Sequence, residues 1–422
     1  MTQRILNEEQ AVAPQESLFF VGRQPILDRA QRIVAYELLF RNGATERAEV
    51  LDDLIASASV ITRCFTELGA QSMLGQHRGF INFNAALLLS DVVEALPPNQ
   101  IVIELLETIE ITPEIATRCR ELKALGYQLA LDDVTEYSSS YTQLAGMVDI
   151  IKLDLKAIDA HALPETVRKL RKLAPILLAE KVDCQEEAQH CKQLGFDLFQ
   201  GYFYARPVIV SGRRADPSKQ ILLRLLQQLT TGADTAEIEQ TLHKAPELSF
   251  KLLRLVNSSA NGRLLQISSL QQAIFALGRE PLQRWLQILM FAQHGADSTP
   301  SPLMVLAAGR AKLLELICNH LGASSEQRNQ AFMAGMLSLL DVLFEMPMVE
   351  LLDEIRIAND MRETLLTQSG ELGLLLRLVI ALELGNFAAV AALRPAALSE
   401  SAMLQLQIEA VEWVDSIGFG GA

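Results

Sequence analysis

Cysteine, histidine and tryptophan are scarce in this sequence, and their scarcity argues against several kinds of site. The 422 residues include five cysteines, six histidines and two tryptophans. The cysteines form no CxxC pair and are odd in number, which favours reduced thiols over a disulfide framework. His190 lies beside Cys191, with Cys184 nearby, but the sequence around them offers no fourth ligand for zinc.

Basic residues and long apolar runs are also lacking. The chain has 37 basic residues against 51 acidic ones, a formal net charge of -14. A DNA- or RNA-binding protein would present a basic field, so neither nucleic acid is expected as a partner. No run of about 18 uncharged apolar residues predicts a membrane span. Residues 1–16 carry Glu8, Glu9 and Glu16 in place of an apolar signal core, so we expect a disordered lead-in and a cytoplasmic protein.

The length fits two domains of roughly 200 residues each. Residues 17–207 alternate β-rich runs with amphipathic helical patterns. Residues 208–219 are rich in Pro, Ser, Gly and charge and are typical of a linker. From 220 to 422 the β-rich runs disappear and apolar residues recur at three- and four-residue spacing. We therefore predict an α/β domain followed by an all-α domain.

The N-terminal domain is predicted to be a TIM-like (β/α) barrel. Its β-rich runs are LFFVG, RIVAYELLF, GFINFN, IVIELLE, YQLALDD, DIIKLDL, PILLAEK and LFQGYF. Alternation of strands with helices implies a parallel sheet, and about eight strands in this length favour a barrel. Only RQPILDRAQ separates the first two runs, which leaves no room for a helix. These two strands are therefore expected to pair as an antiparallel hairpin.

Polar residues stand near the end of each run from the second onward. They are Glu37, Asn82, Glu104 with Glu107, Asp132 with Asp133, Lys152, Glu180 and Gln200. Any one of them alone is more simply explained as a solvated strand end or a surface salt bridge. Burying such groups without partners is costly, and strand ends of a barrel converge on one mouth. Seven consecutive runs with this feature therefore predict one polar site.

Carboxylates and an amide oxygen at one mouth suit Mg²⁺ or Mn²⁺ better than zinc. Adjacent aspartates allow one carboxylate to bridge two ions, the arrangement that activates water for displacement at phosphorus. A lysine among these acids would orient the water and offset charge on the phosphoryl oxygens. The residue types alone therefore point to metal-dependent phosphoester chemistry.

Residues 17–207 resemble the EAL domain of cyclic di-GMP phosphodiesterases. The motifs that carry the resemblance, in order, are AYELLFR, INFN, IELLE, LALDD, IIKLD, LLAEKVD and GFDLFQGYFYARP. The resemblance implies hydrolysis of cyclic di-GMP to pGpG. It implies these metal ligands: Glu37, Asn82, Glu104 and Asp132 for the first ion, and Asp132, Asp133 and Glu180 for the second. It implies these further roles: Lys152, Glu180 and Gln200 in catalysis, Glu107 in steadying the loop after Asp133, and Gln24 and Arg41 in substrate binding.

The loop after Asp133 departs from the family pattern. Active members usually carry DDFGTGYSSL, whereas this chain has DDVTEYSSSY, without either glycine. Glycine permits a positive φ that other residues adopt at a cost. The change leaves a second hypothesis open, in which a degenerate barrel acts as a cyclic di-GMP receptor or scaffold and signals through the helical domain. Family barrels often dimerise near this loop, so a homodimer is a further expectation.

The helical domain resembles the HDOD domain, a relative of the HD phosphohydrolases. The segments LLRLVNSSANG and ISSLQQAIFALG carry the resemblance. Active HD proteins need a His-Asp pair. No aspartate directly follows any of the three histidines in this half, His243, His294 and His320. We therefore predict a non-catalytic regulatory module that binds a protein partner.

Overall fold

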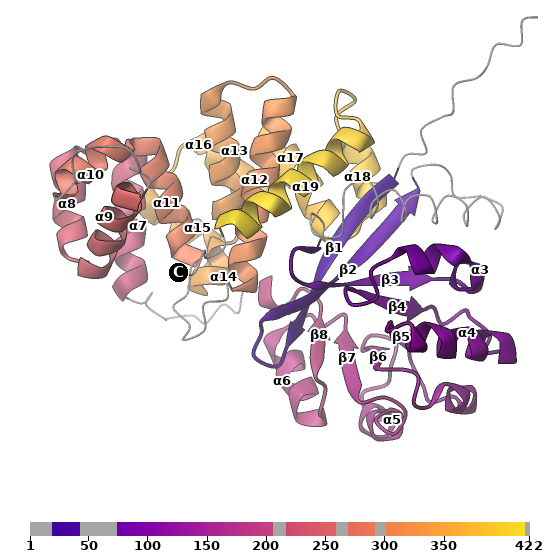
Figure 1. The fold of residues 1–422 in the computed structure, drawn as a ribbon. Helices are drawn as coiled ribbons and strands as arrows, with labels where there is room; N and C mark the ends of the chain where they lie inside the picture. Colours follow the sequence, from indigo (N-terminus) through magenta and orange to yellow (C-terminus); the bar gives the residue numbers. More distant parts are fainter. Residues whose placement is uncertain (1–18, 43–73, 206–216, 259–268, 292–300, 418–422) are drawn as a thin grey trace, which may run out of the picture.

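The computed structural model of the chain describes residues 19–42, 74–205, 217–258, 269–291 and 301–417. Figure 1 shows two halves, a barrel of strands and a larger group of helices. The predicted lead-in (1–16) and most of the predicted linker (208–219) lie outside the described residues. The last three linker positions belong to the first turn of a helix that begins at Pro217, where proline suits the N-terminal turn.

The described strands close into a barrel in sequence order, β1 to β8. They are β1 Phe19–Asp28, β2 Ile33–Asn42, β3 Arg78–Phe83, β4 Ile101–Leu105, β5 Gln128–Val134, β6 Ile150–Asp154, β7 Ile176–Glu180 and β8 Leu198–Gln200. β1 runs antiparallel to both β2 and β8, and the other neighbouring strands pair in parallel. The predicted barrel with an antiparallel first pair is thus confirmed.

The hairpin between β1 and β2 is tighter than its sequence suggests. β1 continues to Asp28, so most of the predicted connection RQPILDRAQ is strand. Asp28 Oδ1 accepts hydrogen bonds from the backbone N–H of Ala30 (2.8 Å) and of Arg32 (2.9 Å), which closes the turn. Gln31 has a φ of 60° there. An aspartate that caps its own turn explains the short connection.

Helices follow most of the parallel strands. They are α3 Ala85–Leu89, α4 Pro113–Ala124, α5 Leu163–Leu170 and α6 Gln185–Leu194, with 3₁₀ helices η2 Asp91–Ala95, η3 Ser139–Leu144 and η4 Phe203–Ala205. Local sequence sets the ends of α4. The Thr112 side chain accepts from the N–H of Ile115 at 3.3 Å, and Gly126 follows the helix with a φ of 96°.

The second half is helical throughout its described residues. Its helices are α7 Pro217–Thr230, α8 Thr235–His243, α9 Pro246–Ser258, α10 Leu270–Leu277, α11 Arg279–Phe291, α12 Pro302–His320, α13 Ser325–Leu337, α14 Leu340–Phe344, α15 Met348–Ile355, α16 Asn359–Thr367, α17 Gly370–Glu383, α18 Phe387–Leu393 and α19 Glu400–Ile417. Their apolar stripes face inward and form a core continuous with that around the barrel.

One segment, Asn359–Glu383, is apolar and long enough to cross a membrane by length and composition. In the structure it is two helices, α16 and α17, separated at Gln368, which has a φ of 52°. Leu376 and Val379 of α17 are buried against the rest of the domain. This burial is typical of a core helix, and the absence of a membrane span stays a prediction.

Inside the barrel, one apolar layer lies below the predicted polar site. It consists of Ile26, Ala35, Phe80, Val102, Ala130, Ile150 and Leu178. Side chains of a strand alternate between its two faces, so the residue two positions further along points the same way. On β2 to β7 those positions hold Glu37, Asn82, Glu104, Asp132, Lys152 and Glu180. On β1, which runs the other way, the equivalent step leads back to Gln24. The polar residues therefore point inward, at the mouth above this layer.

The two halves meet along β1. Helices α17 and α19 contact β1, and α12 contacts η4, which follows β8. Figure 1 shows α17, α18 and α19 beside the hairpin, while α8, α9 and α10 lie at the far end of the molecule. The strand that closes the barrel therefore also forms part of the boundary with the helices.

Candidate functional site

Lys152 stands at the centre of the predicted site. Its Nζ lies 2.5 Å from Glu104 Oε1, 2.7 Å from Asp132 Oδ1, 3.0 Å from Glu180 Oε1 and 3.2 Å from Glu37 Oε2. The five residues come from five different strands and are all buried. The convergence expected from the sequence is thus what the barrel produces.

The charges at this centre shift one another's ionisation. Burial would lower the pKa of Lys152, but Glu104, Glu37, Glu180 and Asp132 together hold that pKa well above its usual range. The ammonium is therefore charged at neutral pH. Four carboxylates less one ammonium leave three negative charges when all are ionised, an excess that favours additional cations.

Burial also makes the acids reluctant to ionise. It raises the pKa of Glu104 well above the ordinary value, helped by the charge of Glu37 and opposed by that of Lys152. Burial raises the pKa of Glu180 to about 7, again opposed by Lys152. The pKa of Asp132 is raised for the same reason. A charged group in a poorly solvated site behaves in this way unless a cation compensates it.

Two amide side chains complete the site around Glu37. Gln200 Nε2 donates to Glu37 Oε2 at 2.6 Å and to Gln24 Oε1 at 2.9 Å. Asn82 Nδ2 donates to Glu37 Oε1 at 3.2 Å. Gln24 and Gln200 therefore lie side by side, and their roles in substrate binding and catalysis stay predictions.

The donor atoms fit a hard divalent cation. Six buried oxygens of this site have no hydrogen-bond partner among the described residues: Asn82 Oδ1, Glu104 Oε1 and Oε2, Asp132 Oδ1, Glu180 Oε2 and Gln200 Oε1. Of these, Glu104 Oε1 and Asp132 Oδ1 form ion pairs with Lys152 Nζ. Unpaired buried acceptors are costly, and oxygen-only sets suit Mg²⁺, Mn²⁺ or Ca²⁺. The carboxylates converge on the ammonium, however, and within the described ranges no three His, Cys, Asp or Glu form a ready metal site. The ligand roles therefore stay predictions.

Asp133 stands apart from its predicted partners. Its Oδ1 lies 3.3 Å from Lys181 Nζ, which also binds Asp154 Oδ2 at 2.6 Å. Asp133 and Lys181 have φ values of 45° and 56°, a conformation that costs energy for residues other than glycine. The structure thus adds Lys181 and Asp154, which our sequence reading missed. The only signal was the position of Lys181 directly after Glu180 in LLAEK.

The altered loop begins in an extended conformation, as a continuation of β5. Val134 is the last residue of β5, pairs with Leu153 and is buried. The register shifts between Leu131 and Val134, which marks a bulge at the two aspartates. Thr135 and Glu136 have no positive φ. The strained conformation therefore falls on Asp133 itself, and a β-branched residue follows it where the family usually has phenylalanine.

Two further residues, Glu107 and Arg41, were given roles by the family resemblance. Glu107 lines the pocket but makes no hydrogen bond or ion pair with the described residues that follow Asp133, so its role in steadying that loop stays a prediction. Arg41 lies in β2, opposite Phe20, but its side chain is outside the described part of the molecule.

Comparison with known proteins places both halves of the chain. Residues 8–207 match the EAL domain and residues 217–361 match the HDOD domain. Cyclic di-GMP phosphodiesterase CdgJ of Vibrio cholerae is 33% identical over 365 residues, which cover 85% of this chain and 83% of CdgJ. The chain belongs to the EAL–HDOD family. Protein YuxH of Bacillus subtilis is 31% identical over 94% of this chain and 98% of its own length.

Solved structures match the EAL half. The BlrP1 calcium and cyclic di-GMP complex from Klebsiella pneumoniae is 26% identical, with a TM-score of 0.38 over 46% of this chain and 58% of that one. An EAL domain protein from Listeria monocytogenes is 23% identical, with a TM-score of 0.35 over 44% of this chain and 87% of that one. In this chain, α17, α18 and α19 lie beyond the HDOD match.

The EAL site opens into a cavity of about 520 Å³. Most of its lining comes from the EAL domain, including Lys181 and Asp183. Leu306, Glu383 and Leu384 also line it, and these belong to the helical half. The sequence did not predict these three residues, because the residue pattern of a helix does not show which other domain the helix will contact.

The HDOD half shows no comparable site in its described ranges. His243 and His320 are exposed, and His294 lies outside those ranges. His243 lies 3.7 Å from Glu239, one helical turn away on the surface. The prediction that this domain is not catalytic remains a prediction, and nothing in these positions opposes it.

Proposed function

We propose that this protein acts in cyclic di-GMP signalling and that its EAL domain hydrolyses cyclic di-GMP to pGpG with the help of divalent metal ions. The observation that carries the proposal is the cluster of Glu37, Glu104, Asp132 and Glu180 around Lys152. It lies in a cavity of about 520 Å³, within the usual range for small-molecule sites. The relative CdgJ is a cyclic di-GMP phosphodiesterase by name, and PdeD of Escherichia coli, 24% identical, is a probable one.

The residues that would hold the metal ions are those with unpaired or acid oxygens: Glu37, Asn82, Glu104, Asp132 and Glu180. We propose Mg²⁺ or Mn²⁺, because the donors are all oxygen. When bound, such ions make a water more acidic and offset charge on the phosphoryl oxygens. Asp133 would join them by exchanging its contact with Lys181 for one with an ion.

The chain's own groups would orient the reactants. Lys152, charged and buried, places a positive charge where negative charge develops on a phosphoryl group. Gln200 presents its amide beside Glu37 and Gln24, so it would position a water or a phosphate oxygen at that edge. The apolar layer below, with Phe80 and Ile150, keeps bulk water out of the barrel.

The test is a product assay on the purified full-length chain with Mg²⁺ or Mn²⁺. We expect pGpG from the wild-type chain and none from Glu37→Ala, because Glu37 joins Lys152, Asn82 and Gln200. Gln185→Ala is a matched control, since Gln185 pairs with Gln31 outside the barrel. Binding of cyclic di-GMP with no turnover by the wild-type chain would overturn the enzymatic proposal.

One observation favours a receptor as the second candidate function. Asp133 is tied to Lys181 and its side chain is 42% exposed, whereas the other acids predicted as metal ligands pair with the buried Lys152. If that contact persists, the second metal lacks a ligand and the barrel binds cyclic di-GMP without cleaving it. Lys181→Met separates the two candidates. If the Asp133–Lys181 contact limits turnover, Lys181→Met should hydrolyse cyclic di-GMP faster than the wild-type chain. If neither protein hydrolyses it, the receptor function is the one supported.

We also propose that the HDOD domain binds a protein partner. We further propose that the protein works in the cytoplasm and that it can form a homodimer. Two large apolar side chains support the first point, since Phe250 on α9 is 66% exposed and Phe275 on α10 is 89% exposed. Exposed phenylalanines are common at protein interfaces. Phe275→Ser should abolish co-purification of a partner, and an unchanged set of co-purified proteins would contradict this assignment.

A further inference from the structure

A buried arginine of the HDOD domain contacts the EAL domain. Arg310 on α12 is only 3% exposed. Its Nε and Nη2 donate to the two carboxylate oxygens of Glu383 at 3.0 and 2.6 Å, and Nη1 donates to Ser338 Oγ at 2.7 Å. Nη2 also donates to the Tyr202 hydroxyl at 2.8 Å. The two-pronged ion pair joins α12 to α17. Tyr202 is an EAL residue whose hydroxyl also donates to Glu383 Oε2 at 3.5 Å, so it ties both helices to the barrel.

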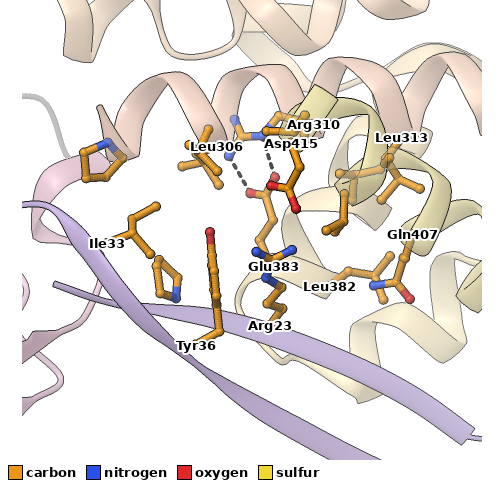
Figure 2. A pocket seen from close by; sticks show the side chains of 18 of the residues that line it. Arg23, Ile33, Tyr36, Leu306, Arg310, Leu313, Leu382, Glu383, Gln407 and Asp415 are labelled. Atoms are coloured by element: carbon orange, nitrogen blue, oxygen red, sulfur yellow. Dashed lines mark hydrogen bonds and ion pairs between the residues drawn. The ribbon is translucent and has the colours of Figure 1, made fainter. Parts of the chain in front are cut away.

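The ion pair lies between two cavities. One is the EAL cavity, and the other, of about 140 Å³, lies between the two halves. Both are lined by Arg23, Tyr204, Leu306 and Glu383. Figure 2 shows the second cavity, with Tyr36 rising from β2 on one side and Arg310 paired with Glu383 on the other. Glu383 is therefore held by Arg310 at the wall that the two cavities share.

Tyr202 is connected to the catalytic centre by a rigid link. It lies two residues after Gln200, whose amide donates to Glu37 at 2.6 Å. Between them Gly201 has a φ of 146°, and a Cβ placed there would overlap the backbone of Val182. Val182 N–H also donates to the carbonyl of Gln200 at 3.0 Å. Because the segment has so little space, displacing Tyr202 displaces Gln200.

The end of α17 packs on the same edge of the barrel. A Cβ built on Gly385 would lie 2.9 Å from Leu39 Cδ1 and 3.6 Å from Gln24 Nε2. Gln24 accepts the second hydrogen bond from Gln200. Leu384, one residue earlier, lines the EAL cavity. Gly385 of the helical half thus lies close to Gln24, the partner of Gln200, while Arg310 holds Tyr202.

We infer that Arg310 is a positioning residue for the EAL site. By fixing Tyr202 and Glu383 it sets the position of Gln200, so a movement of α12 against the barrel changes how well the EAL cavity holds its ligand. The inference rests on the proposed function only for the identity of that ligand, cyclic di-GMP. It makes the helical half a working part of the EAL site, beyond its role as a protein-binding module.

The test compares Tyr202→Phe, Arg310→Met and the double variant in the full-length chain. Hydrogen–deuterium exchange is measured on the barrel segments that contain Val182 and Gln200, and affinity for cyclic di-GMP is measured by calorimetry. We expect faster exchange at both segments and roughly tenfold weaker binding, the loss typical of a hydrogen bond to a charged group. The double variant should lose only slightly more than Arg310→Met, because both single changes break the Arg310–Tyr202 bond and Tyr202→Phe removes in addition only the 3.5 Å hydrogen bond to Glu383. Arg310→Lys should recover part of the loss.

The matched control is Arg284→Met. Arg284 pairs with Glu315 at 2.5 Å and with Asn329, and both partners lie in the HDOD domain. It should leave barrel exchange and cyclic di-GMP affinity unchanged. Unchanged exchange at Val182 and Gln200 in Arg310→Met would overturn the inference, as would the same change in Arg284→Met. If the wild-type chain binds no cyclic di-GMP, the proposed function fails, and the exchange data still decide the role of Arg310.

Discussion

The two domains bury polar groups in different ways. In the EAL domain the described buried polar residues cluster at the barrel mouth: Glu37, Glu104, Asp132, Lys152, Asp154, Glu180 and Gln200. In the helical domain they are scattered: Thr241, Gln287, Arg310, Thr364 and Glu400. Like charges gathered in a poorly solvated site cost folding energy. The EAL domain therefore carries a cluster of buried charges that lowers its stability and provides the groups for a metal-dependent site. In the helical domain, the described buried polar residues are few and dispersed, and stability comes mainly from packed apolar side chains.

Removing the central cation should give the largest effect. In Lys152→Ala, four buried carboxylates lose their shared partner, and we expect the metal-free protein to lose about 3–5 kcal/mol of unfolding free energy. Added Mn²⁺ should restore most of this, while turnover should stay abolished. Denaturant melts with EDTA or Mn²⁺ provide the measurement. Lys123→Ala, which breaks a partly exposed pair with Asp149, is the control, and an equal loss there would show that the buried cluster has no special weight in the stability of the barrel.

The pH dependence of the two domains should have opposite signs. The pKa of Glu180 is raised by burial from 4.5 to about 7, so its contribution to stability is present below pH 4.5 and lost as the pH rises through 7. Metal-free wild-type protein should therefore lose on the order of 2–3 kcal/mol relative to Glu180→Gln between pH 4.5 and 8.

Glu315 of the HDOD domain should behave in the opposite way. Burial would raise its pKa, but hydrogen bonds from Arg284 and Lys312 hold the pKa below its ordinary value of 4.5. Its contribution is present above pH 4.5 and lost as the pH falls below it. Stability curves of Glu180→Gln and Glu315→Gln against pH give the comparison. Parallel curves for the two variants would show that the domains do not differ in this respect.

Packing between helices should give the next effect. Gly335 on α13 faces α12 so closely that a Cβ there would overlap the backbone of Ala311. Gly335→Ala should destabilise the protein by about 1–3 kcal/mol, the usual cost of overpacking. It should also move Arg310, the neighbour of Ala311, so barrel exchange near Gln200 should rise. Thermal melts check the first point, and a stability equal to wild type would mean that α13 moves away freely.

A second glycine should give the smallest effect and the opposite sign. Gly309 on α12 lines the cavity between the domains, and a Cβ there would come no closer than 4.0 Å to Val414 Cγ2. Gly309→Ala should therefore stabilise the protein by about 1 kcal/mol through helix propensity. The measurement is the same melt, run beside Gly335→Ala. Destabilisation by Gly309→Ala would show that the cavity wall tolerates less volume than its geometry indicates.

Much of the EAL site was predictable because the barrel repeats one rule. An inward apolar residue is followed two positions later by a polar one, as with Val102 and Glu104 or Ile150 and Lys152. The strand pattern therefore located the cluster, and the EAL motifs gave its residues roles. The pairing of Asp133 with Lys181 was not predictable, because it depends on a bulge and on the positive φ of Asp133.

The boundary between the domains was not predictable for a different reason. In the sequence, Arg310 is one of a few charges on a mostly apolar helix, beside Lys312 and Glu315, and Glu383 closes another such helix. Nothing in either pattern indicates that they pair with each other or with Tyr202. Contacts between domains depend on three-dimensional docking, which periodicity within one helix does not encode. For the same reason, the sequence did not predict that Leu306 and Leu384 line the EAL cavity.

The position of β1 has a consequence for how the protein is made. β1 pairs with β8 through Ile26 and Gln200, a separation of 174 residues (200 − 26). At about 5–20 residues per second, the first strand waits roughly 9–35 s during synthesis before its partner exists. Helix α19, which also contacts β1, is made later still. β1 is thus synthesised before the other described strands but gains its partner β8 late, and until then its edge is exposed to other nascent chains and to chaperones.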